Sequence, residues 1–206
     1  MSAQLIVKQV ADDVIEIPVG SASDAQSLAR ELRASLNAED IVAGLASVCI
    51  HLRPDQVSSA IDKVSELTLS DPQVADNQAT LEIEVRYGGT HGPDFDAVCR
   101  ALDMTETQFI SLHTERRHKV EMIGFTPGFS YISGLPDTIS IPRLSDPRAR
   151  VPAGSVGISS AYTGIYALAG PGGWPLIGQT DAPLFAPNAS SPFLLEPGRF
   201  VQFKAV

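Results

Sequence analysis

The feature that most constrains this chain is a change of pattern partway along it. Up to about residue 85, apolar residues recur at alternating helix-like and strand-like intervals, which is typical of an α+β layer. Further along, short apolar runs alternate with clusters of Gly and Pro, as in a small β-barrel. We therefore expect two domains: a small α+β domain over residues 1–85 and a mainly-β barrel domain over residues 86–206.

The first half predicts two amphipathic helices between strands. The four-residue spacing of Leu28, Leu32 and Leu36 predicts a helix that begins after the capping residue Ser23. A second helix should begin at Pro54, because proline is favoured at the first helical position. The expected strands cover residues 13–19, 41–52 and 79–87, and residues 69–78 are linker-like.

The second half opens with two short predicted helices, at residues 94–102 and 106–112. Thr105, with Gln108 three residues later, has the pattern of a capping box for the second helix. Helical periodicity then ends. The short runs expected as barrel strands cover residues 119–125, 156–158, 164–168, 176–178 and 200–203.

Charge and composition exclude several classes of partner. With 206 residues and a net charge of −9, the chain lacks the basic clusters that nucleic acids or anionic membranes require. No stretch approaches the length of a membrane span, and no leader peptide is evident. Cys49 and Cys99 lie far apart in apolar surroundings, as expected of reduced, buried thiols. We expect a cytoplasmic protein that meets a small anionic or amide substrate or a protein partner.

Familiar catalytic motifs are missing from the sequence. It contains no phosphate-binding loop, and its histidines have no metal-ligand spacing, so we expect no metal and no covalent cofactor here. If ATP is used, a partner should hold most of it. Ser155 resembles a nucleophile elbow, but Ala153 replaces the first glycine and no helix follows. A turn hydroxyl is the better interpretation of Ser155.

Two segments could instead line a ligand site. The loop over residues 124–134 combines aromatic residues with glycines that let backbone approach a ligand, and we single out Phe125, Pro127, Gly128 and Phe129. The alternative is a tight barrel corner whose rings are core. Tyr166 and Trp174, beside a Gly-rich turn, could form flat pocket walls or could fill the end of the barrel.

Charged candidates lie nearby in the sequence. Arg143 and Arg148 stand among prolines, which restrict the backbone, and arginine suits bidentate capture of a carboxylate. Surface ion pairing is the alternative. His113, at the end of a predicted helix, is the best acid–base candidate, although a histidine there could simply stabilise the helix C-terminus.

Taken together, the motifs resemble one family. The segments that carry the resemblance are, in order, YGGTHGPD, SLHTERR, IGFTPGFSYISGLP, PRLSDPRARVPAGSVGIS, TGIYALAGPGGWPLIGQT and LFAP. They cover about residues 80–206 and resemble the KipI-like family, whose members are also called allophanate hydrolase subunit 1 or the B subunit of 5-oxoprolinase. Before residue 80 the chain is similar to the family only in layout.

This resemblance implies a cyclophilin-like barrel after the α+β domain, and a role as the small subunit of an ATP-dependent 5-oxoprolinase, which opens 5-oxoproline to glutamate. It implies a partner similar to allophanate hydrolase subunit 2, also called KipA-like, and a third oxoprolinase component. Two alternatives come with the family: inhibition of a sporulation-type histidine kinase, and a carboxyltransferase-like role in a biotin-dependent urea or amide carboxylase.

Overall fold

The computed structural model describes residues 5–67 and 79–206, and the chain divides into two compact units, Met1–Asp76 and Asn77–Val206. Each unit has its own hydrophobic core. The division lies before the boundary predicted at 85/86, because strand β5 (Leu81–Tyr87) pairs within the second unit. Local alternation identifies such a strand but not the sheet that it joins. The predicted linker at 69–78 lies outside the described residues.

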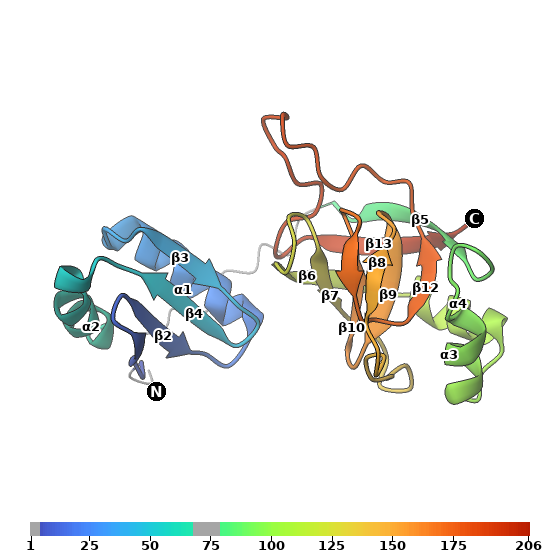
Figure 1. The fold of residues 1–206 in the computed structure, drawn as a ribbon, viewed down its shortest axis with the longest axis horizontal. Coiled ribbons are helices and arrows are strands. Elements are labelled where there is room, and N and C mark those ends of the chain that lie inside the picture. The colour runs from blue at the N-terminus through green and yellow to red at the C-terminus, as the bar shows by residue number, and fades with distance from the viewer. Residues whose placement is uncertain (1–4, 68–78) are drawn as a thin grey trace. The chain divides into compact units, whose positions relative to one another are not determined.

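An antiparallel sheet and two helices form the first unit (Figure 1). Its strands, in sheet order, are β1 (Lys8–Ala11), β2 (Val14–Pro18), β4 (Ser47–His51) and β3 (Asp40–Ala43). Its helical segments are α1 (Ala22–Ser35), the 3-10 turn η1 (Pro54–Gln56) and α2 (Val57–Ser65). The single strand predicted over 41–52 is therefore wrong. It is a hairpin, in which the Gly44 N–H donates to the Ser47 carbonyl at 2.7 Å and reverses the chain.

Helix α1 buries the face that the sequence predicted. Leu28 and Leu32 are fully buried against the sheet, where Ile15 and Ile50 are buried too. The predicted cap is two residues late, because the Ser21 hydroxyl, not that of Ser23, accepts the bond from the Asp24 N–H at 3.1 Å. The apolar spacing thus locates the packed face more reliably than it locates the helix end.

Seven strands of the second unit close into a barrel in the order β10-β7-β6-β13-β5-β12-β9 (Figure 1). They are β5, β6 (Arg117–Ile123), β7 (Ser130–Ser133), β9 (Ser155–Ser159), β10 (Tyr162–Ile165), β12 (Leu176–Gln179) and β13 (Phe200–Ala205). Strands β5 and β13 pair in parallel, so the two ends of this unit meet in one wall. Closure removes the free sheet edges that an open sheet would expose.

Five of these barrel strands match the short apolar runs of the sequence, and three other strands do not. The unpredicted strands are β7, β8 (Arg148–Val151) and β11 (Gly170–Gly172), of which β8 and β11 form a separate two-stranded ladder. All three lie in segments rich in Gly, Pro or Arg, where strand propensity is weak and pairing partners decide the structure.

Both helices predicted before the barrel are confirmed, as α3 (Phe95–Ala101) and α4 (Glu106–Thr114). The capping box of α4 is present: the Gln108 N–H donates to the Thr105 hydroxyl, and the Thr105 N–H donates to the Gln108 side chain. Phe95 and Phe109 bury these helices against the barrel core. Within residues 5–67 and 79–206, no helix combines the length and apolar character that crossing a membrane demands.

Candidate functional site

Aromatic side chains converge on one small cavity beside strands β7 and β10. We call it the aromatic pocket; its volume is about 60 Å³, and it is lined by Phe125, Phe129, Tyr131, Arg143, Tyr166, Gly172, Gly173 and Trp174. Five of the residues singled out from the sequence meet here, although they come from three separate segments. Tyr131, Gly172 and Gly173 were not singled out; Tyr131 lies on β7 and Gly172 on β11, two strands that the sequence did not predict.

Phe129 is the central ring of the pocket. Its edge-to-face neighbours are Tyr166 at 4.8 Å between ring centroids, Tyr131 at 5.0 Å, Trp174 at 5.5 Å and Phe125 at 5.6 Å. Edge-to-face pairs are the favoured arrangement of aromatic rings and hold one another in place. Since Phe129 is itself almost fully buried, the rings form a pre-organised wall rather than a set of loose surface groups.

Glycine lets the backbone of β11 approach this wall. A Cβ atom built at Gly172 would lie 2.6 Å from the Tyr166 hydroxyl, which is closer than any side chain tolerates. At Gly164 on β10, a Cβ would lie 2.7 Å from the Trp174 ring and 2.9 Å from that of Phe129. The glycines therefore create the space in which the rings lie.

The turn before β7 carries the exposed ring of the pocket. Phe125 has a φ of +69° and is 60% exposed, a costly backbone conformation for a residue with a side chain. Bonds from the Phe129 N–H to the Thr126 carbonyl (3.0 Å) and from the Gly124 N–H to the Phe129 carbonyl (3.1 Å) hold this turn. Pro127 and Gly128 shape the turn but do not line the pocket.

The two arginines have different surroundings. Arg143 is exposed, lines the aromatic pocket, and has no ion-pair partner among the described residues. Arg148 donates through Nη2 to the carboxylate of Asp94 at 2.6 Å, and Asp94 also accepts the Leu176 N–H at 2.7 Å. Asp94 stands at the N-cap position of α3, but its side chain makes no capping bond and binds Arg148 instead.

Tyr166 presents a hydroxyl to this region. Burial raises the pKa of the phenol, and the backbone of Trp174 and the positive charges of Arg143 and Arg148 oppose that rise. The phenol therefore remains protonated at neutral pH and can donate a hydrogen bond. With Arg143, it gives the aromatic pocket two polar donors that suit an anionic or carbonyl oxygen.

His113 lies in the barrel core, fully buried. The Thr163 hydroxyl donates its proton to the Gly157 carbonyl (3.2 Å), so the hydroxyl oxygen accepts a bond from His113 Nε2 (3.1 Å). The other ring nitrogen of His113, Nδ1, accepts a bond from the Tyr87 hydroxyl (2.6 Å). This chain of bonds requires a neutral ring. Burial lowers the pKa of His113 well below its usual range, and neighbouring His118 adds to that effect. Its acid–base role stays a prediction, and the burial favours a structural role.

The remaining nucleophile candidates are also structural. Ser155 is buried in β9, and its backbone bonds Tyr166 and Pro152. Cys99 is buried and Cys49 partly so; both are free, and burial raises the pKa of each thiol. Among the described residues, no group of three or more His, Cys, Asp or Glu side chains could hold a metal ion.

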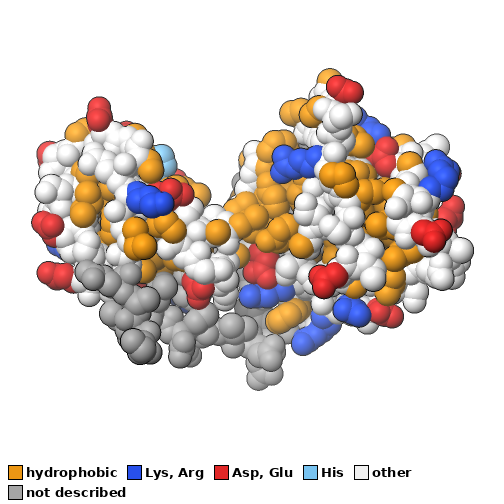
Figure 2. Space-filling model, turned by 90° about the horizontal axis from the view of Figure 1, so that it is seen from below, with side chains coloured by type: hydrophobic (Ala, Val, Ile, Leu, Met, Phe, Trp, Pro, Cys, Tyr) orange, Lys and Arg blue, Asp and Glu red, His pale blue; other side chains and the backbone are white. Residues whose placement is uncertain are grey.

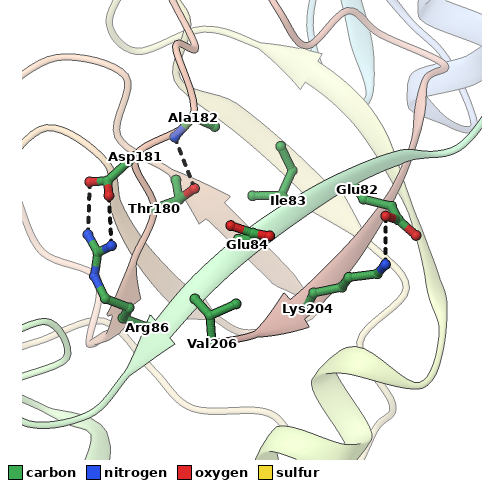
Figure 3. Close-up of a pocket in the computed structure, with 9 residues that line it drawn as sticks. All are labelled: Glu82, Ile83, Glu84, Arg86, Thr180, Asp181, Ala182, Lys204 and Val206. Carbon is green, nitrogen blue, oxygen red and sulfur yellow. Dashed lines mark hydrogen bonds and ion pairs between the residues drawn. The ribbon is translucent and has the colours of Figure 1, made fainter.

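A larger polar pocket of about 450 Å³ lies on the opposite wall of the barrel, outside β5 and β13 (Figure 3). Arg86 forms a bidentate pair with Asp181 (2.7 and 2.8 Å), and Lys204 pairs with Glu82 (2.6 Å). These groups satisfy each other's charge, and the paired guanidinium lowers the pKa of Asp181.

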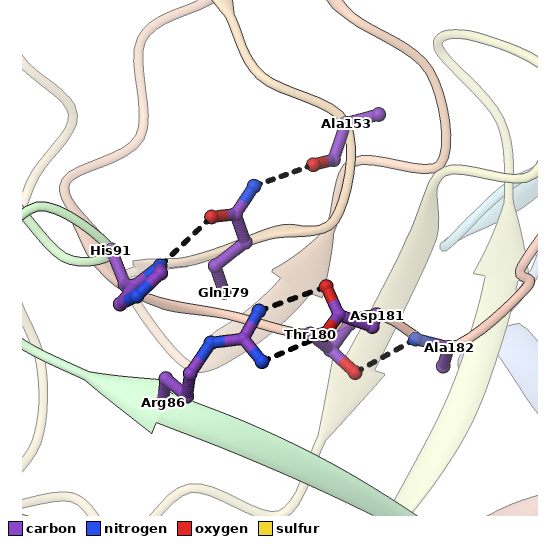
Figure 4. Close-up of polar contacts among 7 residues, drawn as sticks. All are labelled: Arg86, His91, Ala153, Gln179, Thr180, Asp181 and Ala182. Carbon is purple, nitrogen blue, oxygen red and sulfur yellow. Dashed lines mark hydrogen bonds and ion pairs between the residues drawn. The ribbon is translucent and has the colours of Figure 1, made fainter.

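Beside this pair, the Gln179 side chain bridges the His91 ring and the Ala153 carbonyl, so the contacts tie loops to the barrel end (Figure 4). On the barrel face seen in Figure 2, cationic and anionic side chains are likewise interspersed rather than separated by sign. Surface charge thus marks no nucleic-acid site on that face.

Comparison with known proteins connects the chain to one family. The family model described as carboxyltransferase domain, subdomain C and D, matches residues 4–195. The B subunit of 5-oxoprolinase from Escherichia coli O157:H7 is 38% identical over 193 residues, which cover 92% of this chain and 88% of the relative. The B subunit of 5-oxoprolinase from Bacillus subtilis is 43% identical over 127 residues, covering 62% of this chain and 53% of the relative.

Solved structures agree with this result. The crystal structure of TTHA0988 superposes with a TM-score of 0.79 at 28% identity, over 98% of this chain and 40% of that one. The urea amidolyase of Kluyveromyces lactis has a TM-score of 0.76 at 17% identity, over 98% of this chain and 15% of that much longer one. The latter similarity concerns the fold alone.

Proposed function

The chain belongs to the carboxyltransferase-domain family, subdomain C and D, and from this premise we propose that it is the small subunit of an ATP-dependent 5-oxoprolinase. The reaction is the hydrolytic opening of the 5-oxoproline ring to glutamate. The observation that carries the proposal is the convergence of Arg143 with five aromatic rings in the aromatic pocket. A small ring with a carboxylate presents the two features that such a pocket complements, a flat apolar body and an anionic group.

Within the pocket, each group has a role in binding. Arg143, with Arg148 from beside the pocket, orients the carboxylate, Phe129 and Trp174 contact the faces of the ring, and the Tyr166 hydroxyl donates to an oxygen of the ligand. Phe125, exposed at the rim, closes over the bound ring. At about 60 Å³ the cavity is smaller than the roughly 300–1,000 Å³ typical of sites that enclose a ligand. The pocket therefore supplies one wall of the site.

A partner supplies the other wall and the chemistry. The described residues of the aromatic pocket include no carboxylate, thiol or histidine that could act as nucleophile or base. We assign those groups, and most of the ATP site, to an allophanate-hydrolase-subunit-2-like (KipA-like) protein and a third component. The assembly would be cytoplasmic. In this chain the first unit would be a separate α+β domain and the barrel a cyclophilin-like one.

The test is ATP-dependent release of glutamate from 5-oxoproline by the chain mixed with these partners, with each component omitted in turn. Loss of glutamate release when this chain alone is left out is the expected result. Full release without it would contradict the subunit role and would favour kinase inhibition or another substrate.

Carboxyl transfer is a second candidate, favoured by the description of the family itself. In that reaction the same pocket would hold an amide such as urea, and a biotin-carrying partner would deliver the carboxyl group. Biotin-dependent carboxylation of urea by the assembled proteins, in place of glutamate release, would distinguish this candidate.

A further inference from the structure

Asp94 occupies a fixed position between helix α3 and the barrel. Its N–H donates to the Leu176 carbonyl at 3.1 Å, and its own Oδ2 accepts the Leu176 N–H at 2.7 Å. The side chain is only 17% exposed. Two bonds to the same residue's backbone, in a partly buried place, leave the carboxylate little freedom, so its second oxygen Oδ1 is a fixed acceptor.

That fixed oxygen binds Arg148. The Arg148 Nη2 donates to Oδ1 at 2.6 Å, while Nη1 is buried with no hydrogen-bond partner among the described residues. A buried guanidinium nitrogen without an acceptor costs free energy. The cost is explained if an acceptor that the free chain lacks, such as a ligand oxygen, completes the set.

The ladder between β8 and β11 shows which way this guanidinium faces. Arg148 is the cross-strand partner of Gly172, and cross-strand partners project on the same face of a ladder. On that face, a Cβ at Gly172 would meet the Tyr166 hydroxyl at 2.6 Å. The Arg148 side chain therefore projects on the Tyr166 side of the ladder, next to the aromatic pocket but outside its lining. Asp94 lines a neighbouring cavity of about 230 Å³ that includes Arg143.

We propose that Asp94 is a positioning residue for the substrate carboxylate: it holds Arg148 on the Tyr166 side of the β8–β11 ladder, from which the guanidinium orients the carboxylate together with Arg143. This inference rests on the proposed function, because it requires a carboxylate ligand in that pocket. It assigns to Asp94 no contact with the substrate and no proton transfer.

Neutralising Asp94 should change the affinity for a carboxylate ligand in the direction opposite to that expected from its charge alone. Asp94 is a negative charge close to an anion site, so by Coulomb's law its neutralisation should strengthen carboxylate binding. If Asp94 acts by holding Arg148, neutralisation should weaken binding instead, because the guanidinium loses its orientation. Asp94→Asn suits this test, since the amide oxygen can still accept the Leu176 N–H while the amide nitrogen cannot accept from Arg148.

Trp174 makes the experiment direct, because it is the one tryptophan of the chain and lines the pocket. Its fluorescence is titrated in the full-length chain with 5-oxoproline and with pyrrolidin-2-one, the same ring without the carboxylate. Asp94→Asn should weaken 5-oxoproline binding about tenfold, the scale of one charge-assisted bond, and leave pyrrolidin-2-one binding unchanged. Arg148→Lys, which keeps the charge but loses Nη1, should have the same selective effect.

Asp181→Asn is the matched control, because it breaks a second arginine–aspartate pair of the barrel, on the opposite wall, and should change neither affinity. Unchanged or tighter 5-oxoproline binding by the folded Asp94→Asn and Arg148→Lys variants would overturn the inference. Equally weakened binding of 5-oxoproline and pyrrolidin-2-one would overturn it too, because that result indicates a merely structural role. Failure of the unsubstituted chain to bind either compound would overturn the assignment of the aromatic pocket to the substrate, and the inference with it, whereas the subunit role itself is tested by glutamate release.

Discussion

Single glycines decide the shape of the aromatic pocket. Gly172→Ala should destabilise the second unit by about 1–3 kcal/mol and weaken ligand binding, because the new methyl group displaces the Tyr166 hydroxyl. Urea unfolding and titration of Trp174 fluorescence measure the two effects. Gly170→Ala, on the same strand with no atom within 4 Å of its Cβ position, is the control. Equal behaviour of the two variants would contradict the described packing of Tyr166.

The buried histidines make stability depend on pH. Burial lowers the folded-state pKa of His113 and His118 below the ordinary value of 6.5, so below that pH the unfolded chain binds more protons. The contribution of the two neutral rings to the free energy of unfolding is complete above about pH 6.5. As the pH falls below that value, the contribution is lost by up to about 1.4 kcal/mol per pH unit for each ring.

Urea unfolding between pH 7.5 and 5.5 measures this dependence. His118→Gln should reduce the slope, whereas His51→Gln, at an exposed position of the first unit, should not. A free energy of unfolding that stays constant across this range would show that the two rings are not held neutral in the folded chain.

For single helices and strands, the local sequence predicts the features that short-range interactions determine. The helix over 106–114 was foreseen from Thr105 and Gln108, since a capping box acts within one turn. Strand β5 was foreseen too, but was placed in the wrong unit, because its partners β12 and β13 lie about 90 or more residues away in sequence. Strands β8 and β11, rich in Arg, Gly and Pro, exist because they pair with each other.

The placement of β5 can be tested by truncation. Residues 77–206 contain every strand of the barrel and should fold alone, with cooperative thermal unfolding measured by circular dichroism. Residues 86–206, which follow the boundary predicted from sequence, lack most of β5 and should not, because β12 and β13 then lose a shared neighbour. Folding of both fragments, or of neither, would contradict this account of the barrel.

The same distinction governs the candidate site. Residue types identified Phe125, Phe129, Arg143, Tyr166 and Trp174 as candidates, since aromatic rings line small-molecule pockets and arginines bind carboxylates. The sequence could not foresee that Asp94 pairs with Arg148, because that contact joins residues 54 positions apart. It also favoured His113, whose burial follows from the closure of the barrel.

For the whole molecule, we propose that the chain binds the substrate but does not catalyse alone. On this proposal the pocket gathers recognition groups in one unit, and the reacting groups belong to partners. Arg143 should therefore matter for turnover within the assembly, although it makes no ion pair with the described residues that would stabilise the fold.

The most direct measurement is kcat/KM for 5-oxoproline in the reconstituted enzyme carrying Arg143→Ala. We predict a fall of at least about tenfold with unchanged thermal stability, the loss expected when a charge-assisted contact to the substrate is removed. Arg150→Ala, an exposed arginine of the same segment that lies outside the aromatic pocket, should leave turnover unchanged. Equal turnover of the Arg143→Ala enzyme and the unsubstituted enzyme would contradict the claim that this pocket holds the substrate.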